Sequence, residues 1–379
     1  EGEKHKINLV LDPKKVQTKK SLLNYLIPQT QKKLKVVFLY TREPKTSAWL
    51  YSHELGRMYL DETFSDKLET EYVAGVDENN VEQVLEDIIK AGADIVFCVG
   101  PQMMPNSLKV AVAHPEVYIL NCSLNAPHPY IRTYYGRMYE AKFLAGMIAG
   151  AVTDNERVAY IADYPIYGMI ANINAFALGV ASVNPRAKVY LAWSKTKDYD
   201  RDKFLTENDL HYVSDQDIIT PNDASRYFGL YKIQGDQTLN LAMPIWNWGV
   251  FYEKLLQSVL AGSYKAEGQE QVKALNYWWG MSAGVIDLIC SKHVPYGVKR
   301  LADHLKSDIT KGEVVPFFGQ IYNQKGELKN KGEHEMKPSD IMKMDWLVDN
   351  VVGSIPPMSE FIDNAKMVVE LKGVEGNKL

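Results

Sequence analysis

The feature that most constrains the fold of this chain is a repeated alternation of short apolar runs and helix-like stretches. The run LKVVFLY at 34–40 is almost continuously apolar and rich in β-branched residues, which is typical of a parallel strand buried on both faces. A helical stretch at 49–64 follows. The same alternation then continues to residue 123, with strands expected at 68–76, 93–100 and 117–123 and helices at 79–92 and 106–115, the last with Asn106 as a candidate cap. This order predicts a doubly wound α/β domain.

The pattern occurs a second time after Arg132. The stretch at 139–152 carries small residues at 145, 146, 149, 150 and 151, which predicts a helix packed closely on another element. Further strands are expected at 157–163, 187–193, 211–219 and 238–245, with a helix at 169–183. Two similar α/β lobes are therefore expected.

The lobes are expected to combine distant parts of the chain. Lobe 1 is expected to comprise 35–132 plus about 248–284, and lobe 2 133–247 plus about 285–355. Residues 1–34 are interpreted as a linker or N-terminal appendage and 356–379 as a C-terminal tail. Elements after 285 are interpreted as bracing the lobes: a helix at 298–312, a hairpin at 314–328 and a capped helix at 338–353.

Composition excludes several functional classes. A net charge of −4, without a dense Lys/Arg patch in the folded region, argues against nucleic acid as a partner. The three cysteines show no CxxC or metal-ligand spacing, so we expect buried free thiols, no metal site and no cofactor. No run approaches 18 apolar residues, so no transmembrane segment is expected.

The start of the chain leaves its location open. It begins at Glu1 without a signal peptide or a lipidation cysteine, so we expect it to be part of a longer protein. With a signal upstream, it would be a lipid-anchored protein on the extracytoplasmic face of the plasma membrane. The alternative is a cytoplasmic protein.

One motif suggests an enzyme. Residues 280–284, GMSAG, match the G-x-S-x-G nucleophile elbow of serine hydrolases, with Ser282 as the nucleophile. An elbow requires a helix after the serine, whereas the stretch VIDLICS that follows is strand-like. We therefore favour a protein without catalytic residues and keep a serine hydrolase as a minor alternative.

Aromatic residues suggest a ligand site. Trp49, Trp193 and Trp246 each fall at or just after the end of an expected strand, where open α/β sheets bind their ligands. Three rings in such positions are consistent with a stacking pocket for a flat heterocycle. Polar residues at comparable positions are candidate hydrogen-bond partners: Asn121, Ser123, Asn174, Ser214, Asp215 and Asp217. His53, beside Glu54 and Arg57, is interpreted as a surface or hinge residue.

Six stretches together carry a family resemblance. They are SAWLYSHELGR (47–57), YYGRMYEAKFLAGMIAG (134–150), INAFALGVASVNP (173–185), PIWNWGVFY (244–252), WWGMSAGVIDL (278–288) and MDWLVDNVVG (344–353). In this order, from residue 35 to about 355, the chain resembles the basic membrane protein (BMP) family of solute-binding proteins. The resemblance implies a type I periplasmic-binding-protein fold, with two doubly wound α/β lobes joined by three crossovers.

The resemblance also implies a ligand and its contacts. Members of the family typically bind purine nucleosides or bases for an ABC importer, stacking the base between aromatic rings. It implies that Trp49 follows a pocket-lining loop, that Asn174 and Phe176 face the cleft, and that Trp246 lies on a crossover strand; it also places Ser282 within a strand. Thr46 stands where the family usually has an acidic residue in the first loop.

The expected function is therefore non-enzymatic capture of a small ligand between the two lobes, most simply a purine nucleoside or base, for an ABC permease. An intracellular ligand-sensing module of a longer protein is the alternative. Stacking is expected from Trp49 and Phe176, with Trp193 or Trp246 as further candidates, and hydrogen bonds from Asn174 and from Asp215 or Asp217. Trp248, two residues after Trp246, is expected to pack between its helix and the lobe.

Overall fold

The structure, a computed structural model, describes residues 8–14, 32–124, 127–217, 225–267 and 274–372. The chain forms two compact units. Unit 1 comprises residues 1–135 and 247–279, and unit 2 comprises 136–246 and 280–379, so the chain passes between them three times. The boundaries expected from the sequence were at 132/133, 247/248 and 284/285. Most of the expected linker at 1–34 and the end of the tail, 373–379, lie outside the described residues.

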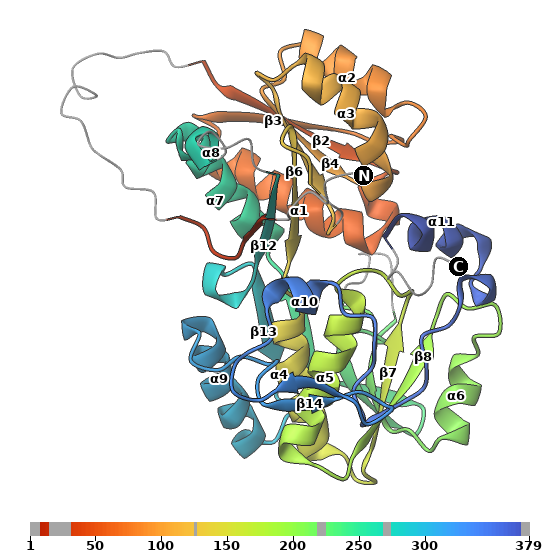
Figure 1. Cartoon of the computed structure of the whole chain (residues 1–379). Helices are drawn as coiled ribbons and strands as arrows, with labels where there is room; N and C mark the ends of the chain where they lie inside the picture. The colour runs from red at the N-terminus through yellow and green to blue at the C-terminus, as the bar shows by residue number, and fades with distance from the viewer. Residues whose placement is uncertain (1–7, 15–31, 125–126, 218–224, 268–273, 373–379) are drawn as a thin grey trace. The chain divides into compact units, whose positions relative to one another are not determined.

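Unit 1 contains a seven-stranded sheet (Figure 1). In spatial order its strands are β1 (Asn8–Val10), β12 (Leu275–Trp279), β6 (Ile131–Gly136), β5 (Tyr118–Cys122), β4 (Ile95–Val99), β2 (Leu34–Tyr40) and β3 (Leu68–Val73). The pairings β1–β12 and those from β6 through to β3 are parallel. Residues 8–10, expected to belong to a linker or N-terminal appendage, thus form an edge strand. In β4 all five residues are buried, as expected for a strand covered on both faces.

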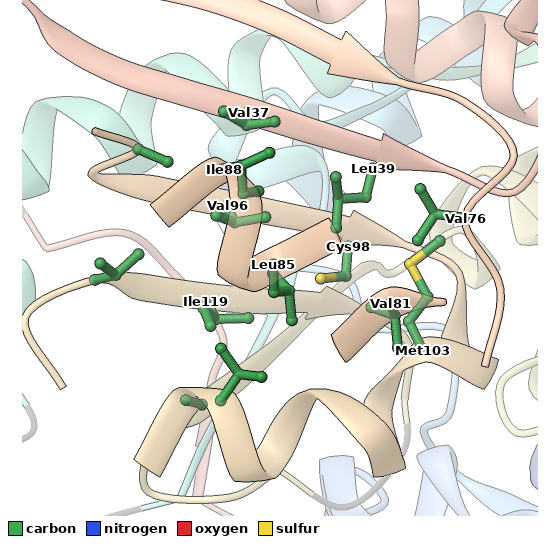
Figure 2. Packing of buried hydrophobic residues seen from close by; sticks show 14 of the residues in the cluster. Val37, Leu39, Val76, Val81, Leu85, Ile88, Val96, Cys98, Met103 and Ile119 are labelled. Atoms are coloured by element: carbon green, nitrogen blue, oxygen red, sulfur yellow. The ribbon is translucent and has the colours of Figure 1, made fainter. Parts of the chain in front are cut away.

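The helices of unit 1 are α1 (Ala48–Thr63), α2 (Val81–Lys90), α3 (Met104–Ala113), α7 (Trp248–Leu260) and α8 (Ser263–Glu267). Figure 2 shows how residues of α2 pack on the sheet, with Ile88 beside Val37 and Val96 and with Leu85 beside Cys98 and Ile119. The expectation that Asn106 caps α3 is wrong. The helix begins two residues earlier, because Pro105 suits its first turn, and the Asn106 amide instead donates to the carbonyl of Glu78.

Unit 2 contains a second seven-stranded sheet, which mixes both strand directions. In spatial order its strands are β13 (Ile286–Cys290), β11 (Gln237–Trp246), β10 (Leu230–Gln234), β9 (Tyr212–Ser214), β7 (Arg157–Ala162), β8 (Lys188–Trp193) and β16 (Val351–Val352). The pairs β9–β7, β7–β8 and β8–β16 are parallel. The pairs β9–β10, β10–β11 and β11–β13 are antiparallel. The strand expected at 211–219 is confirmed only over β9, and residues 218 and 219 lie outside the described residues. Strand β10 was not expected from the sequence.

The helices of unit 2 are α4 (Tyr139–Val152), α5 (Met169–Val183), α6 (Arg201–Glu207), α9 (Tyr296–Lys311), α10 (Pro338–Met342) and α11 (Asp363–Lys372). Strands β14 (Gln320–Tyr322) and β15 (Leu328–Lys331) pair antiparallel, which confirms the expected hairpin. Part of the expected tail belongs to the fold, since Phe361 is fully buried.

The helix expected at 338–353 is wrong beyond Met342. After α10 the chain is held in a non-helical path along α5, because two asparagine side chains, one from each segment, bind the backbone of the other. Asn174 of α5 accepts a hydrogen bond from the Val348 backbone N–H (3.0 Å), and Asn350 donates to the Ala177 carbonyl (2.8 Å). These contacts lead the chain into β16, which pairs with β8.

Helices α4 and α5 pack unusually closely (Figure 1). A Cβ atom added to Gly146 would lie 2.0 Å from the Phe176 carbonyl oxygen, and one added to Gly179 would lie 2.1 Å from that of Phe143. Only glycine allows two backbones to approach this far. The prediction of a closely packed helix from its small residues is confirmed.

Candidate functional site

In unit 1 the candidate ligand residues follow the carboxyl end of β2. A short 3₁₀ turn at Pro44–Thr46 leads to Ser47, whose hydroxyl accepts a hydrogen bond from the Leu50 backbone N–H (3.3 Å) and caps α1. Thr46 is exposed, and its hydroxyl donates to the Glu43 carbonyl (2.7 Å). Trp49 is half-buried in the first turn of α1. The cap therefore fixes the helical turn that carries the Trp49 ring.

Trp49 belongs to a cluster of rings that we call the aromatic cluster: Trp49, His53, Tyr135 and Trp248. The Trp49 ring meets His53 edge to face (centroids 4.8 Å apart, planes at 75°) and Trp248 likewise (5.6 Å, 88°). Tyr135 lies 5.8 Å from Trp49 at a smaller angle of 34°. Edge-to-face pairs are favourable aromatic geometries. Trp248 is 1% exposed, which confirms the expectation that it is packed.

The structure places His53 in a different environment from the one expected from the sequence. It was interpreted as a surface or hinge residue, but it is fully buried. On α1 the apolar residues Leu55, Met58 and Tyr59 are 48%, 50% and 41% exposed. The helix turns its Gly56 face to α7 instead, because a glycine there allows close contact with Gly249. His53 lies one helical turn after Trp49 and shares the buried face of α1 with Leu50 and Leu60. This spacing is the signal in the sequence that could have identified His53 as a buried residue.

His53 is held by a hydrogen-bonded chain in the interior of unit 1. Its Nδ1 lies 2.6 Å from the Tyr252 hydroxyl, which lies 2.8 Å from the Tyr134 hydroxyl. Its Nε2 is 4.0 Å from Cys122 Sγ. Burial lowers the pKa of His53 well below the usual value of a histidine, so the ring is neutral at pH 7.

Two polar side chains at the neighbouring strand ends have unsatisfied atoms. The Asn121 amide donates to the Gly100 carbonyl (3.0 Å), while its Oδ1 has no partner among the described residues; the same holds for Ser123 Oγ. Both side chains are buried. Cys122 pairs with Tyr134 in parallel register, so Ser123 and Tyr135 follow at the same edge of the sheet. Unsatisfied buried polar atoms of this kind are unusual and often mark a functional position.

In unit 2 three aspartates follow the carboxyl ends of β7 and β9, which are paired parallel strands. Asp163 accepts a hydrogen bond from the Ser194 hydroxyl (2.7 Å). Asp215 accepts one from the Tyr231 hydroxyl (2.7 Å), and Arg201 Nε lies 4.0 Å from the same carboxylate. Burial raises the pKa of Asp215, although Tyr231 and Arg201 act in the opposite direction.

Asp217 forms an ion pair with Lys142 of α4, whose side chain is only 3% exposed. Burial raises the pKa of Asp217, partly countered by the positive charge of Lys142. Burial lowers the pKa of Lys142, but Asp217 and Tyr160 outweigh it, so the ammonium group stays charged. The two aspartates expected to bind a ligand therefore each have a cationic neighbour in unit 2.

The two tryptophans predicted at strand ends of unit 2 occupy different environments. Trp193 ends β8 and is 5% exposed; its Nε1 donates to the Ser354 carbonyl (2.8 Å), and its ring meets Phe361 edge to face. Trp246 ends β11 and is half-buried. A Cβ atom added to Gly136 would lie 2.7 Å from the Trp246 ring. Trp246 therefore packs on the backbone at Gly136, where the chain first enters unit 2.

Asn174 and Phe176 of α5 lie in the interior of unit 2. Asn174 donates to the Trp346 carbonyl (2.7 Å), contacts Met344 Sδ and accepts from Val348. Phe176 is 0% exposed and meets Tyr160 edge to face at 5.2 Å. The structure gives both side chains packing partners within the unit, and we do not retain them as ligand contacts.

Ser282 does not lie in the geometry of a nucleophile elbow. It is exposed, in the 3₁₀ turn Met281–Ala283, and strand β13 follows rather than a helix. The turn also replaces the strand that the family resemblance implied at this position. Its neighbour Gly280 is in contact with Glu140, whose carboxylate accepts from the Met281 backbone N–H (2.9 Å).

A cavity of about 470 Å³ lies elsewhere in unit 2, along α6 and the β10–β11 hairpin. Its wall includes Arg201, Asp209, His211, Tyr227 and Asp236. None of the side chains predicted to bind a ligand lines it. Within the described part of the chain, no group of three or more His, Cys, Asp or Glu side chains is arranged to hold a metal ion, and no helix is long and apolar enough to cross a membrane.

Comparison with known families identifies the chain. Residues 33–236, just over half of the sequence, match the family described as Bmp, ABC transporter substrate-binding protein PnrA-like. The chain belongs to this family. The Bmp family consists of solute-binding proteins of ABC transporters, so the family resemblance seen in the sequence is confirmed. The ligand of this protein is therefore a small molecule.

Two similar proteins carry different ligand names. The chain is 28% identical over 342 residues to a purine-binding protein of Brucella abortus, covering 86% of this chain and 95% of that protein. It is 28% identical over 271 residues to TsgA13 of Haloferax volcanii, a putative ABC transporter glucose-binding protein, covering 68% and 67%.

Solved structures confirm the fold. A solute-binding protein from Conexibacter woesei superposes with a TM-score of 0.55 at 14% identity, covering 74% of this chain and 98% of that one. A transcriptional activator of the comK gene from Bacillus halodurans superposes with a TM-score of 0.58 at 12% identity, covering 74% and 99%. The type I periplasmic-binding-protein fold expected from the sequence is thus the fold of this Bmp protein.

Proposed function

We propose that this solute-binding protein captures a purine base or purine nucleoside and that the base stacks on Trp49. The observation that carries the proposal is the placement of Trp49: it follows the carboxyl end of β2, is half-buried, and is held edge-on by His53 and Trp248. A restrained, flat ring at a strand end suits stacking on a heterocycle. The name of the Brucella abortus relative supports the same ligand class.

Each unit, taken by itself, has polar groups whose chemistry suits a purine or its ribose. In unit 1 the Asn121 amide is oriented by Gly100, so its Oδ1, which has no partner in the described part of the chain, can accept from an N–H or O–H donor. Ser123 Oγ can donate or accept. In unit 2, Asp215 and Asp217 are further acceptors, and Trp246 and Trp193 remain candidate rings. Exposed Thr46 offers a neutral hydroxyl in the first loop rather than a carboxylate.

We further propose that the protein delivers its ligand to an ABC permease on the extracytoplasmic side of the plasma membrane, where a lipid anchor would hold it. Family membership supports the transport role. Labelling of intact cells with a membrane-impermeant reagent tests the location. Labelling only after lysis would contradict it and favour the cytoplasmic sensing module.

Calorimetric titration tests the ligand. Adenosine, guanosine, inosine, adenine and xanthine are titrated into the protein, with glucose as the competing ligand class. We expect at least one purine to bind and Trp49→Ala to weaken its binding by about tenfold to a hundredfold, the usual loss when an aromatic partner of a base is removed. Tyr296→Ala, which removes a 76% exposed ring from α9, is the control and is expected to bind as the wild type does.

Heat signals for glucose and for none of the purines would refute the proposed ligand and favour the ligand class named for TsgA13. Equal affinities of Trp49→Ala and the wild type for a purine would keep the ligand but remove Trp49 from the site.

A further inference from the structure

We infer that His53 is a positioning residue, which sets the orientation of the Trp49 ring before any ligand binds. The inference depends on the proposed function for the ligand class and adds a second residue to the same site. His53 itself is fully buried, so its effect on a ligand would act through Trp49. The two side chains stand one helical turn apart on α1, with ring centroids 4.8 Å apart and planes at 75°.

Two independent contacts fix the plane of the His53 imidazole. Its face stacks on Trp248, with centroids 4.3 Å apart and planes at 22°. Its edge is bound through Nδ1 to the Tyr252 hydroxyl at 2.6 Å. A phenylalanine would keep the stacked face but lose the bond at the edge, whereas a glutamine could accept the bond but has no ring. Histidine combines both restraints in one side chain.

The hydrogen bonds around His53 form a consistent directional chain. If Tyr134 donates to Tyr252 and Tyr252 donates to Nδ1, each hydroxyl donates once and the imidazole accepts as a neutral ring. The proton then resides on Nε2, which points toward Cys122 Sγ at 4.0 Å. Tyr134 and Tyr252 are both fully buried, where a hydroxyl without a partner would be costly. This chain of hydrogen bonds therefore holds the His53 ring in place from the interior of unit 1.

Restraint of this kind matters for affinity because ordering a side chain on binding opposes binding. Trp49 is only half-buried, and its ring contacts include His53, Trp248 and Tyr135. With the His53 ring held in place, Trp49 meets a fixed surface. With that ring free to tilt, Trp49 would sample several orientations, of which only some could stack on a base.

The test compares His53→Phe with Leu85→Ala. Leu85 is fully buried in the core formed by α2, α3 and the sheet, so its truncation lowers the stability of the same unit away from the aromatic cluster. We expect His53→Phe to weaken binding of the tightest ligand among adenosine, guanosine and inosine by about fivefold to tenfold, as for loss of one hydrogen bond. Leu85→Ala is expected to retain wild-type affinity.

A second measurement needs no ligand. Protein labelled with 5-fluorotryptophan gives a ¹⁹F resonance for Trp49, assigned through its loss in Trp49→Phe. We expect that resonance to shift or broaden in His53→Phe and to remain unchanged in Leu85→Ala. An unchanged Trp49 resonance in His53→Phe, or equal affinity losses in both variants, would overturn the inference. If the wild type binds no purine, the proposed function fails, and the ¹⁹F comparison alone decides the role of His53.

Discussion

Substitution of Gly146 by alanine tests whether the backbone contact between α4 and α5 is as close as the structure indicates. The new Cβ would lie 2.0 Å from the Phe176 carbonyl oxygen, 2.8 Å from its carbonyl carbon and 3.0 Å from its Cα. All three atoms belong to the backbone of α5, so no side-chain rotation can relieve the overlap. To restore an ordinary contact of 3.4 Å, the helices must separate locally by about 1.4 Å.

The expected magnitude follows from two opposing effects. Overpacking of a core typically costs about 1–3 kcal/mol, and sometimes more. Alanine is better than glycine in a helix by up to about 1 kcal/mol. Because the overlap is with backbone, we place Gly146→Ala at the upper end of the first range and expect a net loss of about 2 kcal/mol. For a unit of this size, that corresponds to about 4–8 °C in Tm.

The matched control is Gly297→Ala. Gly297 also lies in a helix, α9 of the same unit, but a Cβ there would meet nothing within 4 Å. This variant is expected to be as stable as the wild type or more stable by up to about 1 kcal/mol. Urea unfolding followed by circular dichroism measures both. A Gly146→Ala protein at least as stable as Gly297→Ala would refute the close packing of α4 on α5.

Three further predictions concern buried side chains. Trp248→Ala should cost about 3–5 kcal/mol of unfolding free energy, measured by chemical denaturation, because it removes a ring that is 1% exposed; a loss below about 1 kcal/mol would contradict its role in the core. The pKa of His53 is lowered in the folded state, so below about pH 6.5 the unfolded state binds a proton that the folded state does not bind. The unfolding free energy should therefore fall by about 1.4 kcal/mol per pH unit relative to that of His53→Gln. Parallel pH profiles for the two proteins would disprove this. Lys142→Met should cost roughly 3–5 kcal/mol at pH 7 by leaving Asp217 buried without its cation, and the deficit should shrink as the pH falls and Asp217 becomes protonated; a deficit independent of pH would exclude this explanation.

Predictions of individual elements succeeded where the local pattern was strong. The run at 34–40 predicted β2 because its apolar residues leave no polar face, and β2 is buried over its last five residues. The small residues of 139–152 predicted the close approach of α4 to α5, since a short side chain is needed wherever backbones meet. Asn174 shows the limit of such reasoning. Its amide is equally suited to a ligand or to the backbone at 344–348, and only the folded chain reveals that the backbone binds it.

The sequence by itself determined the α/β class, the two-part organisation and the family, because hydrophobic periodicity and the order of motifs are properties of the chain. Tertiary structure decided which face of α1 is buried, where the chain leaves a helical path after Met342, and how His53 supports Trp49. Each of these depends on contacts between residues far apart in sequence, such as Gly56 with Gly249 and His53 with Tyr252. The spacing of residues along a helix does not indicate such long-range partners. The contacts that hold the residues of the candidate site in place could therefore be identified only in the folded chain.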